Sequence, residues 1–290
     1  EAIMPFIKIL VPLAGVTRDR FALATALAAA KPFNAHVVAM FVHVDPRESV
    51  PYGELPLSPD IVQDLIDTAA DLEKASCKAA RATIAAMTSE ADVRIVSTPQ
   101  RGEGVTLSYL EMREHLPRAL DKTARLCDLV VFPPIRETDD PEVQDGFIRT
   151  LMKLGRPVLL SAEHCPTSLG TNVAVGWDGS IASAHALSAS LPFLRQAARV
   201  EILIVQNGAL PGDGSDVAAY LALHGVTAST RILPRGDAMT AEVLLDTAAN
   251  GGFDLLVAGG YGHSQMAEAI FGGVTEHIVS HPRIPVFMMH

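Results

Sequence analysis

Five glycines near the end of the chain have types and spacing that could bind a phosphate. Gly259, Gly260 and Gly262 follow a short apolar run, and Gly272 and Gly273 open a stretch with helical spacing. Glycine lets a backbone approach a ligand closely, and the free N–H groups at a helix start favour an anion. The two glycine clusters therefore predict one phosphate cradle, although glycines at a strand end can also be simple turn residues.

Other glycine-rich phosphate motifs do not fit this stretch. The chain has no GxxxxGK[ST] sequence, and GxGxxG fails because Gln265 stands where its third glycine is needed. A dinucleotide fingerprint would also follow the first strand of its unit, whereas these glycines follow a fourth apolar run. A different kind of phosphate site is indicated.

One polar side chain could meet a phosphate at such a cradle, and a second could shape a turn after an earlier strand. Asp178 follows an earlier apolar run, and His263 follows Gly262 directly. Asp178 suits an Asx turn or a helix cap at least as well as contact with a ligand, and the structural and ligand-binding roles can hold together. His263 can donate to a phosphate, but a loop histidine is more often only solvated. Trp177 is expected to anchor the structure rather than to stack on a ligand.

Other kinds of chemistry have little support. The ten histidines show no metal-ligand spacing and no HExxH, so no metal site is expected. No GxSxG nucleophile motif occurs. The three cysteines have no pairing pattern and are expected to be reduced thiols; they are Cys77, Cys127 and Cys165.

One charged group resembles a carboxylate–histidine constellation but is better explained as the solvated face of a helix. It lies on a long connection that we predict to be helical over 107–126, with a break near Pro117. Its members are Glu103, Glu111, Arg113, Glu114 and His115.

The elements that would position the glycines form a regular alternation. Short apolar runs bounded by Gly or Pro alternate with helical patterns, which predicts parallel sheets covered by helices on both faces. The predicted strands, two of which include the turn that follows (6–15 and 172–180), are 6–15, 35–45, 92–100, 127–134, 157–162, 172–180, 199–206, 227–234, 253–259 and 284–289. The predicted helices are 18–31, 57–87, 107–126, 142–155, 182–197, 218–224, 240–251 and 274–281.

The alternation is an internal repeat of two halves with five strands each. Ile9–Gly15 matches Val173–Gly179, and Asp128–Pro134 matches Asp254–Gly260. We therefore predict domains at 1–163 and 170–290. In the first copy the prolines Pro133 and Pro134 replace two glycines, and proline has no N–H to offer. Ala14 also stands where the second copy has Asp178, so the first domain is read as degenerate.

Length and charge agree with this organisation. The chain has 290 residues, enough for two domains. Its net charge of −10 argues against bulk binding to nucleic acid or to anionic membranes. No apolar run approaches the roughly 18 residues of a membrane span. A cytoplasmic protein without a nucleic-acid or membrane partner is expected.

The spacing Gly259-x2-Gly262-x9-Gly272 resembles the nucleotide-binding signature of the universal stress protein family. The stretches VAVGWDGS, DLLVAGGYG and IPVFMM resemble the first strand, fourth strand and closing strand of that family. The whole chain resembles a tandem pair of such domains, and the resemblance is stronger in the second copy. It implies two doubly wound five-stranded α/β domains of the adenine nucleotide alpha hydrolase-like type.

The resemblance also implies a ligand, ATP or another adenine nucleotide with Mg²⁺. Gly259 and Gly262 would contact ribose and phosphate, Gly272 the phosphates, and Asp178 the adenosine. The end of the second strand in the second copy, at Val205 and Gln206, would flank the adenine. The full set of implied nucleotide-binding residues is Asp178, Val205, Gln206, Gly259, Gly262, His263, Gly272, Gly273, Val274 and Thr275.

One departure from the signature weakens the expectation. Gly273 stands where ATP-binding members have Ser or Thr, and Thr275 lies two residues further on. Losing a hydrogen bond to a charged group would reduce affinity about ten-fold. A stress-response or signalling protein that binds nucleotide is the first hypothesis, and a protein that acts only through partner contacts is the second. An enzyme is the weakest reading, with slow hydrolysis at most, because no tuned acid–base pair stands out.

The resemblance implies an assembly as well. The two halves would pack as an intramolecular pseudo-dimer through their fifth strands, and a further homodimer is expected.

Overall fold

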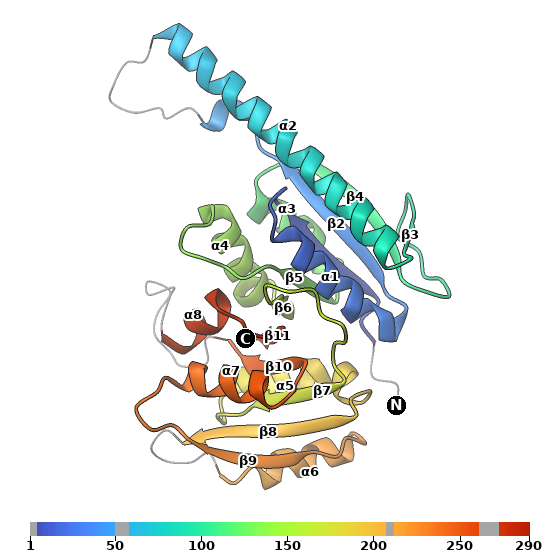
Figure 1. Ribbon diagram of the computed structural model, residues 1–290, viewed down its shortest axis with the longest axis vertical. Helices are drawn as coiled ribbons and strands as arrows, with labels where there is room; N and C mark the ends of the chain where they lie inside the picture. Colours follow the sequence, from blue (N-terminus) through green and yellow to red (C-terminus); the bar gives the residue numbers. More distant parts are fainter. Residues whose placement is uncertain (1–4, 50–57, 207–211, 261–272) are drawn as a thin grey trace.

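The computed structural model describes residues 5–49, 58–206, 212–260 and 273–290. Its strands form one eleven-stranded sheet in the order β3-β4-β2-β1-β5-β6-β11-β10-β7-β8-β9 (Figure 1). The first half contributes β1 Lys8–Leu13, β2 His36–His43, β3 Arg94–Ile95, β4 Thr106–Arg113, β5 Leu129–Phe132 and β6 Val158–Leu160. The second half contributes β7 Asn172–Gly176, β8 Arg199–Gln206, β9 Ser229–Pro234, β10 Leu255–Gly259 and β11 Val286–Met289.

The two halves join where β6 and β11 meet. Neighbouring strands are parallel within each half, but β6 and β11 pair antiparallel, with Leu159 opposite Phe287. Aromatic rings from both halves pack at this junction, and the centroids of Phe6 and Phe193 lie 5.0 Å apart. This is the pairing through fifth strands that the resemblance implies. The chain is therefore a tandem pair of doubly wound α/β units that share one sheet.

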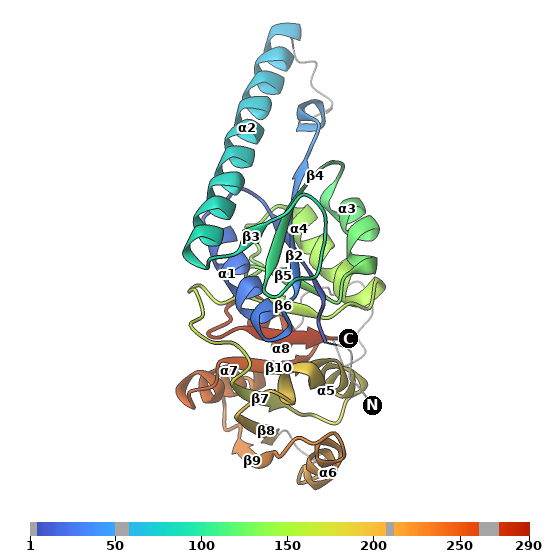
Figure 2. The ribbon, with the colours of Figure 1, turned by 90° about the vertical axis from the view of Figure 1, so that its right-hand side faces the viewer.

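Helices cover both faces of the sheet and divide the core in two. One layer contains α1 Asp19–Ala30, α2 Pro59–Glu90, α5 Ile181–Leu194 and α6 Ser215–Leu223. The other contains α3 Leu116–Thr123, α4 Pro141–Ile148, α7 Thr240–Asn250 and α8 Gly273–Ser280. Figure 2 shows α1 and α2 on one side of the first half's strands and α3 and α4 on the other. Short helical turns at Lys31–Phe33, Pro46–Ser49, Ala124–Leu126 and Arg149–Lys153 complete the elements.

The expected helix over 107–126 is wrong in its first part. Residues Thr106–Arg113 form β4, which pairs with β2 along its full length. The expected third strand shrinks to the two residues of β3 at the sheet edge. Pro117 lies at the first turn of α3, where proline is tolerated because its missing N–H has no helical partner. Proline therefore starts this helix instead of breaking a longer one.

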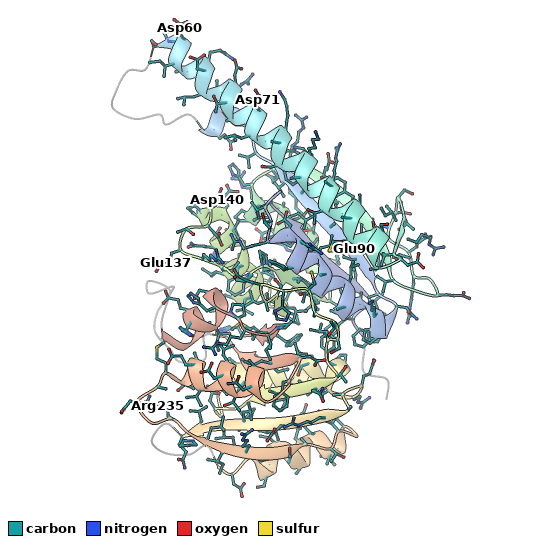
Figure 3. The ribbon with its side chains drawn as sticks, viewed as in Figure 1. Asp60, Asp71, Glu90, Glu137, Asp140 and Arg235 are labelled. Carbon is teal, nitrogen blue, oxygen red and sulfur yellow. The ribbon has the colours of Figure 1, made fainter. Side chains whose placement is uncertain are left out.

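Helix α2 is the longest element and extends well beyond the sheet. Ser58 caps its start by accepting a hydrogen bond from the Ile61 N–H. Asp60 and Asp71 lie on its outer part, and Glu90 lies at the end beside α1 (Figure 3). Only the inner part of α2 contributes buried residues, beginning with Cys77. Among the helices that the structure describes, no one combines the length and apolarity needed to cross a membrane.

Candidate functional site

Several of the described residues that were predicted to bind a ligand lie at the carboxyl edge of the second half's sheet, namely Asp178, Val205, Gln206 and Gly259. Strand β7 lies between β10 and β8, with Val175 opposite Val257 and Gly176 opposite Leu203. This register places the turn after β7, which carries Asp178, between the ends of the two neighbouring strands. In open α/β sheets, ligands bind beyond such carboxyl ends.

The turn after β7 is shaped by its own polar side chains. Asp178 Oδ1 accepts a hydrogen bond from the Ser180 N–H at 2.9 Å, which is an Asx turn. Gly179 has φ +77°, a conformation that favours glycine. Ser180 is the N-cap of α5, and its Oγ accepts from the Ser183 N–H at 3.1 Å. The Asx-turn alternative for Asp178 is thus confirmed, while the helix cap falls to Ser180.

Two of the predicted residues end β8. Val205 is buried in the core, whereas Gln206 is exposed and ends the strand opposite Pro234. Trp177 donates its backbone N–H to Leu203 O at 2.9 Å and packs partly buried against the core. Its position agrees with the expected anchoring role.

Gly259 has a packing role that the sequence did not indicate. A Cβ at this position would lie 2.6 Å from Ser183 N, at the first turn of α5. That distance is shorter than any real Cβ contact, so only glycine lets β10 approach α5 this closely. Gly260 continues the sheet by donating its N–H to Met289 O at 2.9 Å. These two glycines therefore join the end of β10 to α5 and to β11 whether or not a ligand binds.

The second glycine cluster is described only in part. Helix α8 begins at Gly273 and includes Val274 and Thr275, and Thr275 is buried. Gly262, His263 and Gly272 lie outside the described residues. Gly259 and Gly273 bracket this segment at the end of β10 and the start of α8.

The first half closes its matching edge with a carboxylate. Asp19, on the first turn of α1, accepts hydrogen bonds from the backbone N–H groups of Ala14, Gly15 and Val16. The shortest of these, from Gly15, measures 2.7 Å. Burial raises the pKa of Asp19, and the three backbone hydrogen bonds oppose that rise. The amides that could hold an anion here are already bound to an internal one.

An ion pair bridges the same edge. Arg18 Nη1 donates to Pro134 O at 2.6 Å, and its guanidinium also pairs with Asp139. Burial alone would raise the pKa of Asp139, but hydrogen bonds from Arg18 and from the Arg136 N–H outweigh it and lower the pKa. The pair ties the loop after β1 to the loop after β5.

The charged group on the long connection is not the face of one helix. Glu111 and Arg113 belong to β4, and Glu114 and His115 follow it. Glu114 pairs with Lys122 of α3. His115 contacts Glu142 of α4, which also accepts the Leu116 N–H at 3.0 Å. The hydrogen bond that His115 donates to Glu142, followed by the charges of Glu142 and Glu48, raises the pKa of His115.

A second set of residues was missed because β4 was expected to be helical. Glu111 lies close to His43 at the end of β2 and to Cys77 on α2. The apolar-to-polar alternation at Val105, Leu107 and Tyr109 was the available strand signal.

Comparisons with known proteins agree with this fold. Residues 235–290 match the model of the Universal stress protein family. No curated protein shows a significant match to the chain. A universal stress protein from Archaeoglobus fulgidus DSM 4304 superposes with a TM-score of 0.65 at 14% identity, covering 97% of this chain and 95% of that one. A functionally unknown protein from Pseudomonas aeruginosa PAO1 gives a TM-score of 0.54 at 13% identity, covering 98% and 92%.

The structural matches show that this chain has the universal stress protein fold, with two α/β units in one chain. The family match at the C-terminal end then confirms the predicted resemblance to the universal stress protein family.

Proposed function

We propose that the second half binds ATP or another adenine nucleotide, and that its occupancy reports a stress or energy state. The observation that carries this proposal is the difference between the matching strand edges. In the first half, Asp19 fills the anion position from within. The repeat places Ser183 at the corresponding point of the second half, and Ser183 Oγ turns back to Ser180 O at 2.8 Å.

The described residues suit the parts of a nucleotide. Gln206 lies exposed at the end of β8, where it would flank the adenine, and Asp178 would meet the adenosine from the turn after β7. The start of α8 at Gly273 offers backbone N–H groups and the positive end of a helix dipole to phosphates. Gly273 brings no hydroxyl, so this grip rests on backbone donors and is weaker than in the family signature.

Magnesium would accompany the nucleotide, held mainly by phosphate oxygens and water. No described residue at this edge forms an acid–base pair suited to activate water. We therefore propose a binding protein in which hydrolysis of the nucleotide is slow at most.

Calorimetric titration of the full chain with ATP, ADP and AMP in the presence of Mg²⁺ tests the proposal. We expect saturable binding and a rise in melting temperature with nucleotide concentration. Gly272→Val should abolish binding, because its side chain would intrude on the phosphates, while Pro133→Gly in the first half should leave binding unchanged. Circular dichroism shows whether each variant keeps its fold.

Gly259 is a poor site for this test, because its substitution would disturb the packing of β10 on α5. The proposal would be overturned if about millimolar nucleotide gave neither binding heat nor a shift in melting temperature. A dissociation constant above about 1 mM is too weak for a specific ligand. Such a result would leave partner contacts as the function of the chain. Rapid turnover of ATP would instead identify an enzyme.

A further inference from the structure

We propose that His43, Cys77 and Glu111 form a binding site for a divalent, zinc-type metal ion in the first half. One ligand atom from each of these residues lies within 4.8 Å of the other two. They come from the end of β2, the middle of α2 and the body of β4, and no sequence spacing joins them. Packing of α2 across β2 and β4 creates the group.

The distances suit a tetrahedral ion. Zinc bonds of about 2.0–2.3 Å place neighbouring ligand atoms roughly 3.3–3.8 Å apart. His43 Nε2 lies 3.2 Å from Glu111 Oε2, and Cys77 Sγ lies 4.0 Å from Glu111 Oε1. Small side-chain rotations would bring all three ligands to a shared ion. Three protein ligands leave a fourth position for water or for another ligand.

A second carboxylate orients the histidine. Glu73, one helical turn before Cys77, contacts His43 Nδ1. An imidazole that donates its Nδ1–H to a carboxylate keeps a lone pair on Nε2, which here faces Glu111. Metal-binding histidines are typically held by such a partner. Glu73 is therefore a positioning residue.

An arginine holds the carboxylate ligand. Arg81, one turn after Cys77, donates its Nε–H to Glu111 Oε1 at 2.8 Å. This contact leaves Oε2, the oxygen nearer to His43, available to an ion. Glu73, Cys77 and Arg81 are spaced by four residues, so they share one face of α2.

The charges and ligand types select the class of ion. Glu73, Glu111 and a Cys77 thiolate carry three negative charges, Arg81 carries one positive charge, and a divalent ion supplies the remaining two. The sulfur and nitrogen ligands suit Zn²⁺ and related transition metals more than Mg²⁺ or Ca²⁺. The His43 and Glu111 side chains are 21% and 29% exposed, which gives an ion access from solvent.

The described residues of the second half contain no counterpart to this group. Gln206 ends β8 as His43 ends β2, and Ile232 stands opposite Ile204 as Glu111 stands opposite Phe41. Helix α6 has 9 residues, whereas α2 has 32. The proposed site therefore depends on elements that are specific to the first half.

The experiment is a titration of chelator-treated full-length protein with Zn²⁺ and with Co²⁺. We expect one equivalent of either ion to bind, with a thiolate-to-cobalt charge-transfer band and the visible spectrum of a tetrahedral site. Cys77→Ser should remove the charge-transfer band and weaken Zn²⁺ binding at least ten-fold. Cys127→Ser and Cys165→Ser are the matched controls and should leave both properties unchanged.

Two further variants separate the ligands from the positioning residue. Glu111→Gln should weaken binding and change the visible spectrum. Glu73→Gln should weaken binding about 10- to 100-fold, as second-shell changes do, but keep the charge-transfer band. Circular dichroism of each metal-free variant checks the fold. An intact band in Cys77→Ser, or no bound ion in wild-type protein, would overturn the proposal, and His43 would then be the centre of an ion-pair network with Glu73 and Glu111.

Discussion

The carboxyl edges of the two halves have the same architecture and opposite chemistry. In the second half, glycines end β10 and begin α8, and Asp178 shapes the turn between β7 and α5. In the first half, prolines follow β5, and Asp19 binds the backbone amides after β1. A fold that offers an anion site at its strand ends can thus fill that site with its own carboxylate. The first half therefore differs from the second both in its bound internal carboxylate and in the prolines that stand where the second half has glycines.

The two halves also differ at the strands covered by α2 and α6, and here it is the first half that carries the proposed site. The first half has a long α2 over β2 and β4, and these elements bring together a histidine, a cysteine and carboxylates. The second half has a short α6 and an isoleucine where Glu111 stands. The half without the glycine motif therefore carries the proposed metal site. A shared sheet places both proposed sites in one molecule without requiring them to share residues.

The largest expected effect comes from removing the internal anion. Asp19→Ala leaves three backbone N–H groups without their carboxylate partner, and hydrogen bonds to a charged group contribute about 1.5–3 kcal/mol each. We expect a loss of about 3 kcal/mol in the free energy of unfolding, measured by urea denaturation. The matched change Ser183→Ala should cost about 1 kcal/mol. Equal losses at the two positions would contradict the difference between the edges.

A second prediction concerns the close approach at Gly259. Gly259→Ala forces a methyl group against the backbone of Ser183. Because Ser183 belongs to a packed helix, its backbone cannot easily move away. Overpacking of this kind costs about 1–3 kcal/mol, and we expect about 2 kcal/mol. The matching position in the first half is Pro133, and Pro133→Gly should cost less than about 1 kcal/mol through chain entropy. Thermal melting of both variants makes the comparison, and a stable Gly259→Ala variant would contradict the packing role.

Much of the fold could be predicted because buried parallel strands are continuous apolar runs. Residues 199–206, for example, form the predicted strand. The segment at 106–113 failed because its charged residues suit a helix face as well as a strand. Its strand character comes from pairing with β2, about 70 residues earlier, as in the His36–Thr106 contact. Local patterns do not contain such long-range pairing.

The sites divide in the same way. Glycine spacing is a local signal, so the cradle could be proposed from the sequence. The role proposed for residues 261–272 remains a prediction. The bonds from Ala14, Gly15 and Val16 to Asp19 depend on the exact path of a turn. The approach of His43, Cys77 and Glu111 depends on how α2 lies across the sheet. Neither could be read from residue types alone.

A third prediction tests the bridge across the first half's edge. Asp139→Asn removes the charge that pairs with Arg18, and we expect a loss of roughly 1–2 kcal/mol near neutral pH, less than for a fully buried pair. The folded-state pKa of Asp139 is lowered, so its contribution is present above the usual aspartate pKa of about 3.9. It is lost as the pH falls through the folded value. Urea titrations of wild type and variant should therefore converge in acid, and a constant difference would contradict the ion pair.

The smallest expected effect comes from comparing the N-termini of two helices, α3 and α7. At α3, Glu142 accepts the Leu116 N–H and also contacts His115, whose pKa it raises. At α7, Glu242 accepts the Met239 N–H at 3.2 Å within its own helix. A histidine whose pKa is raised in the folded state stabilises the fold. This contribution is fully present below the unfolded-state pKa of about 6.5 and is lost as the pH rises through the folded-state pKa.

We therefore expect His115→Gln to remove a shallow fall in melting temperature above about pH 6.5, worth roughly 0.5 kcal/mol because the pair is exposed. Glu242→Gln should lower stability by a similar amount but leave that pH dependence in place, since the α7 cap involves no histidine. Melting curves from pH 5.5 to 8.5 distinguish the two outcomes, the window being chosen around the histidine range. A pH dependence that survives in His115→Gln would assign it to another group and remove this difference between the halves.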